Sequence, residues 1–228
     1  MLRRKSRQQE QGFTLVEVIV AILIATVFVS ITMQAMVMAV ILKARAKEYS
    51  EAINWVQQDL EQAKHRASRY KITTASGAAL GATSITVASS AGFAVNDTIL
   101  VGIDAQSYTI TQVSGNTLTI SPALNNTTPN VYGPNLLVVN NTFCNAPNSS
   151  SGFGQYFVNE LNASQVINPS TKTFSTGRQF TITRNPIAVN AIPYNRLRID
   201  YDVKSTQGGL SVAKMNAEII PDAALRCP

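Results

Sequence analysis

The sequence predicts an α+β fold in which a long N-terminal helix packs on an antiparallel β-sheet. The 228-residue chain has neither Gly nor Pro between Phe13 and Ser76, so nothing in that stretch breaks a helix. The remainder contains short runs in which apolar and polar residues alternate, as they do in half-buried strands. With two Cys and one His, the composition argues against a His/Cys metal site and a Cys-x-x-Cys redox pair.

The first part of the expected helix has the length and composition of a membrane span. Residues 18–42 form a run of 25 residues without a charge, and a helix needs about 20 residues to cross a bilayer. Glu17 precedes this run, and a lone carboxylate in hydrocarbon costs roughly 2.5–3.5 kcal/mol, which indicates a function or a charged partner. On hydropathy alone, a plain signal-anchor helix is the alternative. Basic residues ahead of the run hold the N-terminus in the cytoplasm: Arg3, Arg4, Lys5 and Arg7.

The segment Gly12-Phe13-Thr14-Leu15-Val16-Glu17, directly after this basic leader, resembles the N-terminus of type IV pilins and pilin-like prepilins. The resemblance implies that a prepilin peptidase/methyltransferase cuts between Gly12 and Phe13 and methylates the new amine of Phe13. It also implies that Glu17 pairs with the terminal amine of a neighbouring subunit, where the two charges relieve each other's desolvation cost. The implied partners are other pilin subunits and the pilus assembly platform in the inner membrane.

Beyond Lys43 the expected helix becomes amphipathic and continues to about Tyr70. Polar residues are expected on its solvent side: Glu48, Glu51, Gln57, Gln58, Asp59, Glu61 and Lys64. Apolar residues recur at spacings of three and four, which places them on one face: Tyr49, Ile53, Val56, Leu60, Ala63, Ala67 and Tyr70. This stripe indicates core packing against a sheet that the rest of the chain supplies.

The exported part is expected to be β-rich and to consist of two pieces. Strands are predicted at 83–88, 98–103, 107–113 and 117–121, with a hairpin turn at Ser114-Gly115-Asn116, and then at 135–139, 179–184, 197–204 and 210–220. An exposed loop is expected at 145–152. The resulting division is a prepilin leader at 1–12, a transmembrane or filament-core half at 13–42, an amphipathic half at 43–72, an inserted β module at 77–124 and a C-terminal β-rich pilin head at 125–228. The module is interpreted as a decorative insertion or as an adhesive contact module.

Cys144 and Cys227 are the only cysteines, and both lie in the part expected to leave the cytoplasm. A structural disulfide between them is the favoured interpretation, and two free thiols are the alternative. The resemblance supports the disulfide, because pilin heads commonly carry one near the C-terminus. Closing a loop of more than 80 residues stabilises a fold by up to roughly 4–5 kcal/mol in the chain-entropy model.

No sequence motif indicates catalysis or a cofactor: there is no phosphate loop, no His-Glu-x-x-His and no Gly-x-Ser-x-Gly. His65 is interpreted as a solvated or partner-facing residue rather than as a catalytic base. Asp200 and Asp202 alternate with Arg198 and Lys204 on one strand and are interpreted as a solvated face rather than as a catalytic pair. The sequence therefore predicts a protein that is not an enzyme.

Nucleic acid is a weaker hypothesis for a partner. The net charge is +6, but residues 1–12 contribute +3 of it, and residues 72–171 contain no Lys or Arg. Binding to a phosphate backbone needs several cationic contacts, and no aromatic platform accompanies the basic residues. Those residues are Lys64, Arg66, Arg69, Lys71, Arg196 and Arg198.

Three functions follow from these observations. The first is a minor pilin of a type IV pilus, serving priming, adhesion, motility or DNA uptake, which waits in the inner membrane (N-in, C-out) before assembly and then reaches the cell surface. The second is a periplasmic pseudopilin of a type II secretion system, and the third is a membrane-anchored binding protein that never assembles. Major pilins of the family that the chain resembles often carry Gly and Pro in the membrane half; this chain has neither there, so the resemblance favours a minor subunit. The large, nearly neutral, Thr- and Asn-rich head favours an exposed pilus.

Overall fold

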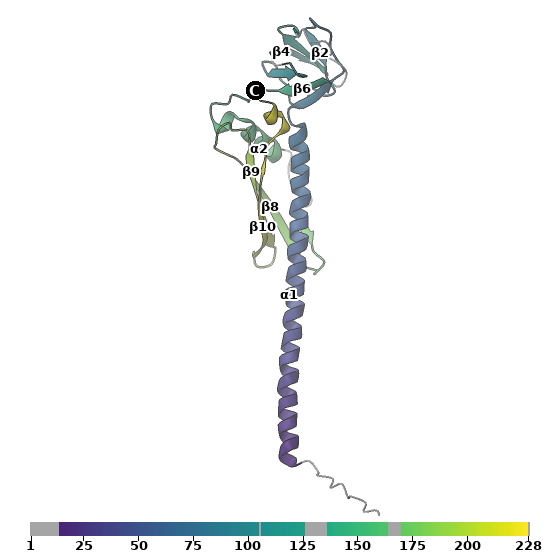
Figure 1. Ribbon diagram of the computed structural model, residues 1–228, viewed down its shortest axis with the longest axis vertical. Coiled ribbons are helices and arrows are strands. Elements are labelled where there is room, and N and C mark those ends of the chain that lie inside the picture. The colour runs from purple at the N-terminus through teal and green to yellow at the C-terminus, as the bar shows by residue number, and fades with distance from the viewer. Residues whose placement is uncertain (1–13, 105, 126–135, 164–169, 228) are drawn as a thin grey trace, which may run out of the picture. The chain divides into compact units, whose positions relative to one another are not determined.

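The computed structural model describes residues 14–104, 106–125, 136–163 and 170–227 (Figure 1). The chain divides into two compact units, Met1–Glu48 and Tyr49–Pro228. We describe each unit by itself and call the latter the second unit. Gly12 and Phe13 lie outside the described residues.

One uninterrupted helix, α1, spans Leu15–Arg69, as the absence of Gly and Pro predicts. Within the first unit its apolar side chains are exposed, including Leu15 at 77% and Phe28 at 66%. An 18-residue window of this helix has a mean hydropathy of 2.6, and none of that window is buried. By length and composition, α1 can therefore cross a membrane.

The second unit contains a four-stranded antiparallel sheet in the order β10-β9-β8-β7. Along β9, side chains that are buried alternate with side chains that are more exposed, as predicted: Leu197 and Ile199 are buried, and Arg198 and Lys204 are exposed. Asp202 pairs with Lys204 at 3.3 Å, and Asp200 pairs with Arg198 at 3.1 Å, which confirms a solvated charged face. The four strands are β7 (Thr171–Thr173), β8 (Gln179–Ala188), β9 (Leu197–Ser205) and β10 (Ser211–Ile219).

The C-terminal half of α1 packs on this sheet, which confirms the expected partner of the helical stripe. Shared core residues come from the helix and from the two central strands: Ala52, Val56, Leu60, Ala63 and Ala67 from α1, and Ile182, Leu197, Ile199, Tyr201 and Val203 from β8 and β9.

The predicted stripe is wrong in detail near its start. Tyr49 is 54% exposed, whereas Trp55 is only 4% exposed and lies in the core. Two residues expected on the polar side, Glu48 and Asp59, are each only 4% exposed. The buried side of the helix instead includes Ala52, Val56, Asp59 and Ala63. The helix is therefore rotated slightly about its axis from the orientation that the apolar residues alone predict.

A second helix, α2 (Phe153–Ala163), was not predicted. Its buried Phe157 and Leu161 belong to the core between α1 and the four-stranded sheet. Gly154 permits its close approach, because a Cβ there would lie 2.3 Å from the carbonyl oxygen of Arg196. Before α2, the expected exposed loop contains a short 3-10 helix, η1 (Ser149–Ser151), capped by Asn148.

The other sheet of the second unit has six strands in the order β1-β6-β3-β4-β5-β2. All four strands expected within 77–124 are present, and the sheet also includes β1 and β6 from outside that range. The strands are β1 (Ile72–Ala75), β2 (Ser84–Thr86), β3 (Thr98–Val101), β4 (Ser107–Ser114), β5 (Thr117–Ser121) and β6 (Leu136–Asn140).

Backbone hydrogen bonds join the two outer strands of this sheet. Ser76 N–H donates to Thr86 O at 3.2 Å, and Ala88 N–H donates to Thr74 O at 2.7 Å. The six strands thus close around their own apolar core, which includes the fully buried Tyr108. Closure leaves the outer strands β1 and β2 paired with each other rather than open to another chain.

Candidate assembly site

The first turn of α1 holds Glu17 in a defined position. Val18 N–H donates to Thr14 O at 3.2 Å, and Glu17 N–H donates to Thr14 Oγ1 at 3.3 Å. Thr14 is therefore the N-cap of the helix, and Glu17 occupies the third helical position. This Thr-x-x-Glu spacing is that of a capping box, a signal that the sequence analysis missed.

Glu17 is exposed and has no ion-pair partner among the described residues. A carboxylate in the first turn is favoured by the partial positive charge of the helix N-terminus. Apolar side chains surround it on the helix, including the exposed Leu15, Val16 and Val18. This arrangement places a carboxyl group, without an ion-pair partner among the residues that the structure describes, at the end of an exposed apolar helix, where a cation from another molecule can reach it.

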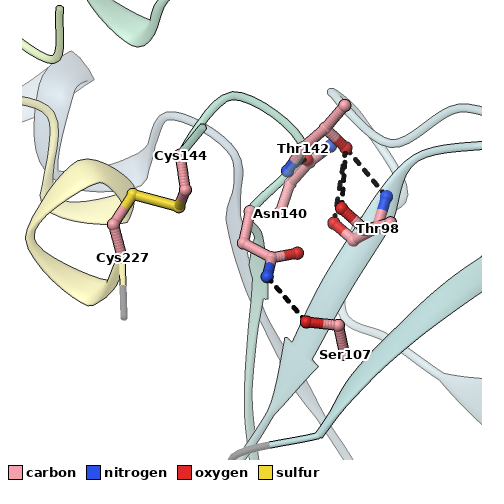
Figure 2. The surroundings of a disulfide bond; sticks show 7 residues. Thr98, Ser107, Asn140, Thr142, Cys144 and Cys227 are labelled. Carbon is pink, nitrogen blue, oxygen red and sulfur yellow. Dashed lines mark hydrogen bonds between the residues drawn. A yellow bond between two sulfur atoms is a disulfide. The ribbon is translucent and has the colours of Figure 1, made fainter. Parts of the chain in front are cut away.

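The two cysteines form a disulfide, as predicted, with 5.3 Å between their Cα atoms and a sequence separation of 83 residues (Figure 2). Cys227 follows a short 3-10 helix, η2 (Asp222–Arg226), and Cys144 follows β6. Both cysteines pack around a small core formed by Val139, Phe153, Ala223 and Ala224. The disulfide therefore ties the C-terminal segment to the end of the six-stranded sheet and to the start of α2.

The segment between β6 and Cys144 is held to β3 by Thr142. Its Oγ1 accepts a hydrogen bond from Thr98 N–H at 2.8 Å (Figure 2). Asn140 Oδ1 accepts a hydrogen bond from Thr142 N–H at 3.1 Å, which fixes the turn. Cys144 is thus positioned by the six-stranded sheet rather than by a loose loop.

A buried polar network in the second unit joins α1 to the four-stranded sheet. Asp59 Oδ2 accepts a hydrogen bond from the Tyr201 hydroxyl at 2.6 Å, and Asp59 Oδ1 lies 3.2 Å from Arg184 Nη1. Arg184 Nη2 also donates to Leu161 O of α2 at 3.0 Å. Burial first, and then the hydrogen bond to Asp59, raise the pKa of Tyr201 well above its ordinary value. This network therefore links α1, α2, β8 and β9.

The contribution of Tyr201 to this network is expected to appear as a loss of folding stability at alkaline pH. The native state retains the Tyr201 proton after the unfolded chain, with a pKa of about 10, has lost it, so stability falls as the pH rises above 10. We expect Tyr201→Phe to reduce the fall in the free energy of unfolding between pH 10 and 11, measured by urea unfolding, by about 1 kcal/mol. The exposed Tyr49→Phe is the control, and an equal slope in the wild type and Tyr201→Phe would contradict the assignment.

The expected basic cluster is divided in the structure. Lys64 pairs with Glu61 at 2.8 Å, and Arg196 pairs with Glu218 at 3.5 Å. Arg66, Arg69 and Lys71 line one pocket at the end of α1, together with His65, which is exposed as predicted. Within the described ranges, no group of three or more His, Cys, Asp or Glu side chains could hold a metal ion.

Residues 7–33 match the family model described as the prokaryotic N-terminal methylation motif. No curated protein and no solved structure matches the chain. The matched range includes Gly12, Phe13 and Glu17, together with the N-cap Thr14. The N-terminal segment therefore carries the methylation motif, a class III signal that is typical of type IV pilins and pseudopilins.

Proposed function

We propose that this protein is a minor pilin, a structural subunit that enters a type IV pilus through α1. The observation that carries the proposal is the methylation motif at 7–33, followed by an apolar helix whose most hydrophobic window is not buried. Cleavage between Gly12 and Phe13 would place a cationic amine four residues before Glu17. That amine on one subunit and the Glu17 carboxylate of another would neutralise each other in the filament core.

The unprocessed chain would first reside in the inner membrane, with its N-terminus facing the cytoplasm and the second unit outside. A prepilin peptidase/methyltransferase would act there, before the assembly platform transfers the subunit into the filament. The helix would then leave the bilayer and pack against the apolar helices of other pilin subunits. This role requires no cofactor and no catalytic residue.

A pseudopilin of a type II secretion system is the second candidate, because the same motif and helix serve both assemblies. The composition of the second unit favours the pilus. Residues 72–171 contain no Lys or Arg and are rich in Thr, Asn and Ser, as in a surface exposed outside the cell. The six-stranded sheet built within that range would form a contact module on the filament surface.

N-terminal mass spectrometry of sheared surface filaments and of membranes tests the proposal. A peptide that begins with N-methyl-Phe13 in the sheared fraction would support the minor pilin. The processed form in membranes alone would overturn it in favour of the pseudopilin. An intact Met1 or Leu2 terminus in both fractions would leave only a simple membrane anchor.

A Glu17→Gln variant separates processing from assembly. It keeps the size of the side chain but removes the charge that would pair with the Phe13 amine. We expect at least a tenfold loss of the protein from sheared filaments, with the chain still present in membranes. Glu61→Gln, an exposed change on the same helix, is the matched control. Undiminished incorporation of Glu17→Gln would exclude the proposed charge pairing.

A further inference from the structure

An open pocket of about 430 Å³ lies where α1 ends in the second unit, and most of its polar lining is basic. We call it the helix-end pocket. It is lined by His65, Arg66, Arg69, Tyr70, Lys71, Ala91, Gly92 and Glu160. The following hundred residues, 72–171, contain no Lys or Arg, so within residues 65–171 every Lys and Arg lies between positions 66 and 71.

Lys71 adopts an unusual backbone conformation there. It lies two residues beyond the end of α1 with a φ of 60°, in the left-handed region that glycine adopts with less strain. A strained residue of this kind points to a use for its side chain. Arg66 and Arg69 stabilise the C-terminus of α1 through the helix dipole, but that explanation does not extend to Lys71, which lies past the helix.

The Lys71 side chain is held in place while its charge stays poorly compensated. Its Cδ packs beside the Gly92 backbone, because a Cβ added to that glycine would lie only 3.4 Å from it. Its Nζ lies 5.2 Å from the centroid of the Phe143 ring. Burial lowers the pKa of Lys71, although the carboxylates of Asp97 and Glu160 oppose this effect. Among the described residues, no carboxylate lies within ion-pair distance of Lys71.

The backbone beside Lys71 offers a further donor. Gly92 N–H has no hydrogen-bond partner in the part of the chain that the structure describes. Lys71, Arg69 and Gly92 all line one pocket, and cations beside a backbone N–H that has no partner are a combination that binds oxyanions through charge-assisted hydrogen bonds. Glu160 is the one carboxylate in the lining.

We propose that the helix-end pocket binds a small ligand through a single oxyanion, either a carboxylate or a phosphate. The cations and the Gly92 N–H hold the oxyanion, while Glu160 repels a second negative charge. A ligand with one anion and neutral hydroxyl groups, such as a carboxylated sugar, fits both requirements. This binding activity is separate from filament assembly and does not rest on it.

Ligand-observed NMR on the full chain in a non-ionic detergent tests the proposal with inorganic phosphate, glucuronate and glucose. We expect a Kd on the order of 1 mM for at least one anion and much weaker binding of glucose, the uncharged match of glucuronate. Preference for phosphate or for glucuronate would assign the class of oxyanion. Binding of glucose as tight as that of glucuronate, or no binding of either anion at 10-fold higher concentration (about 10 mM), would overturn the proposal.

Two variants distinguish binding from folding. Lys71→Gly removes the side chain but relieves the positive φ, so we expect at least about a tenfold loss of affinity and no loss of thermal stability. Glu160→Gln removes the repelling carboxylate and is expected to tighten binding severalfold. Lys214→Gln, an exposed change on β10, is the control. Unchanged affinity in both Lys71→Gly and Glu160→Gln would exclude the helix-end pocket as the site.

Discussion

Replacing Asp59 with Ala is expected to cost about 3–5 kcal/mol of folding stability, because it leaves Arg184 buried without its charge partner. Arg184 and Asp59 are 11% and 4% exposed at their side chains, so solvent compensates little of the loss. The Tyr201 hydroxyl would also lose its acceptor. A total stability of 5–15 kcal/mol is usual for a domain, so this single change removes a large share of it.

Urea unfolding followed by the fluorescence of Trp55 measures the effect. Trp55 is the single tryptophan, and it lies 4% exposed in the core between α1 and the four-stranded sheet. Glu61→Ala is the matched control, two residues along the same helix, where an exposed pair with Lys64 contributes about 0–1 kcal/mol. A loss in Asp59→Ala no larger than that in Glu61→Ala would mean that the buried network does not stabilise the fold.

The double variant Asp59→Ala/Arg184→Ala tests whether the two residues act as a unit. We expect it to cost clearly less than the sum of the single changes, because removing both partners leaves no unpaired buried charge. Strictly additive losses would contradict a direct pairing. This cycle separates the ion pair from the ordinary cost of truncating two buried side chains.

The burial of Asp59 and its partners could not be predicted from the sequence. Its partners Arg184 and Tyr201 lie 125 and 142 residues away along the chain, so no local pattern identifies them. By helical periodicity Asp59 is a polar residue beside an apolar stripe, and only the sheet that packs on it makes it a core residue. The strands were predicted well because their alternation is local, as in Leu197–Ser205.

Other misses have similar causes. The apolar spacing of α2, with Phe153, Phe157 and Leu161 four residues apart, is visible in the sequence, but the Ser- and Gly-rich segment before it obscured the helix. The inclusion of β1 and β6 in the six-stranded sheet depends on pairing between Ile72 and Val139, 67 residues apart. At the N-terminus, by contrast, the methylation motif is a short contiguous segment, so the sequence alone was enough to identify it.

Removing the disulfide is expected to cost roughly 4–5 kcal/mol, the entropy that an 83-residue closure removes from the unfolded chain. The closed segment contains α2 and the whole four-stranded sheet, so most of the core around Trp55 is built from residues inside it. We expect the reduced protein to unfold at a much lower urea concentration than the oxidised protein. The chain contains only these two cysteines, so no other disulfide can substitute.

The double variant Cys144→Ala/Cys227→Ala is the control for this comparison. It should match the reduced wild type in stability and should not respond to a reductant. Hydrogen exchange locates the effect: we expect η2 (Asp222–Arg226) to lose protection first, because the small core of Val139, Phe153 and Ala224 holds it beside the disulfide. The closed core of the six-stranded sheet, which lies outside the covalent loop, should retain its protection. Equal stability of the oxidised and reduced proteins would show that packing alone fixes the C-terminal segment, and the disulfide would then have no structural role.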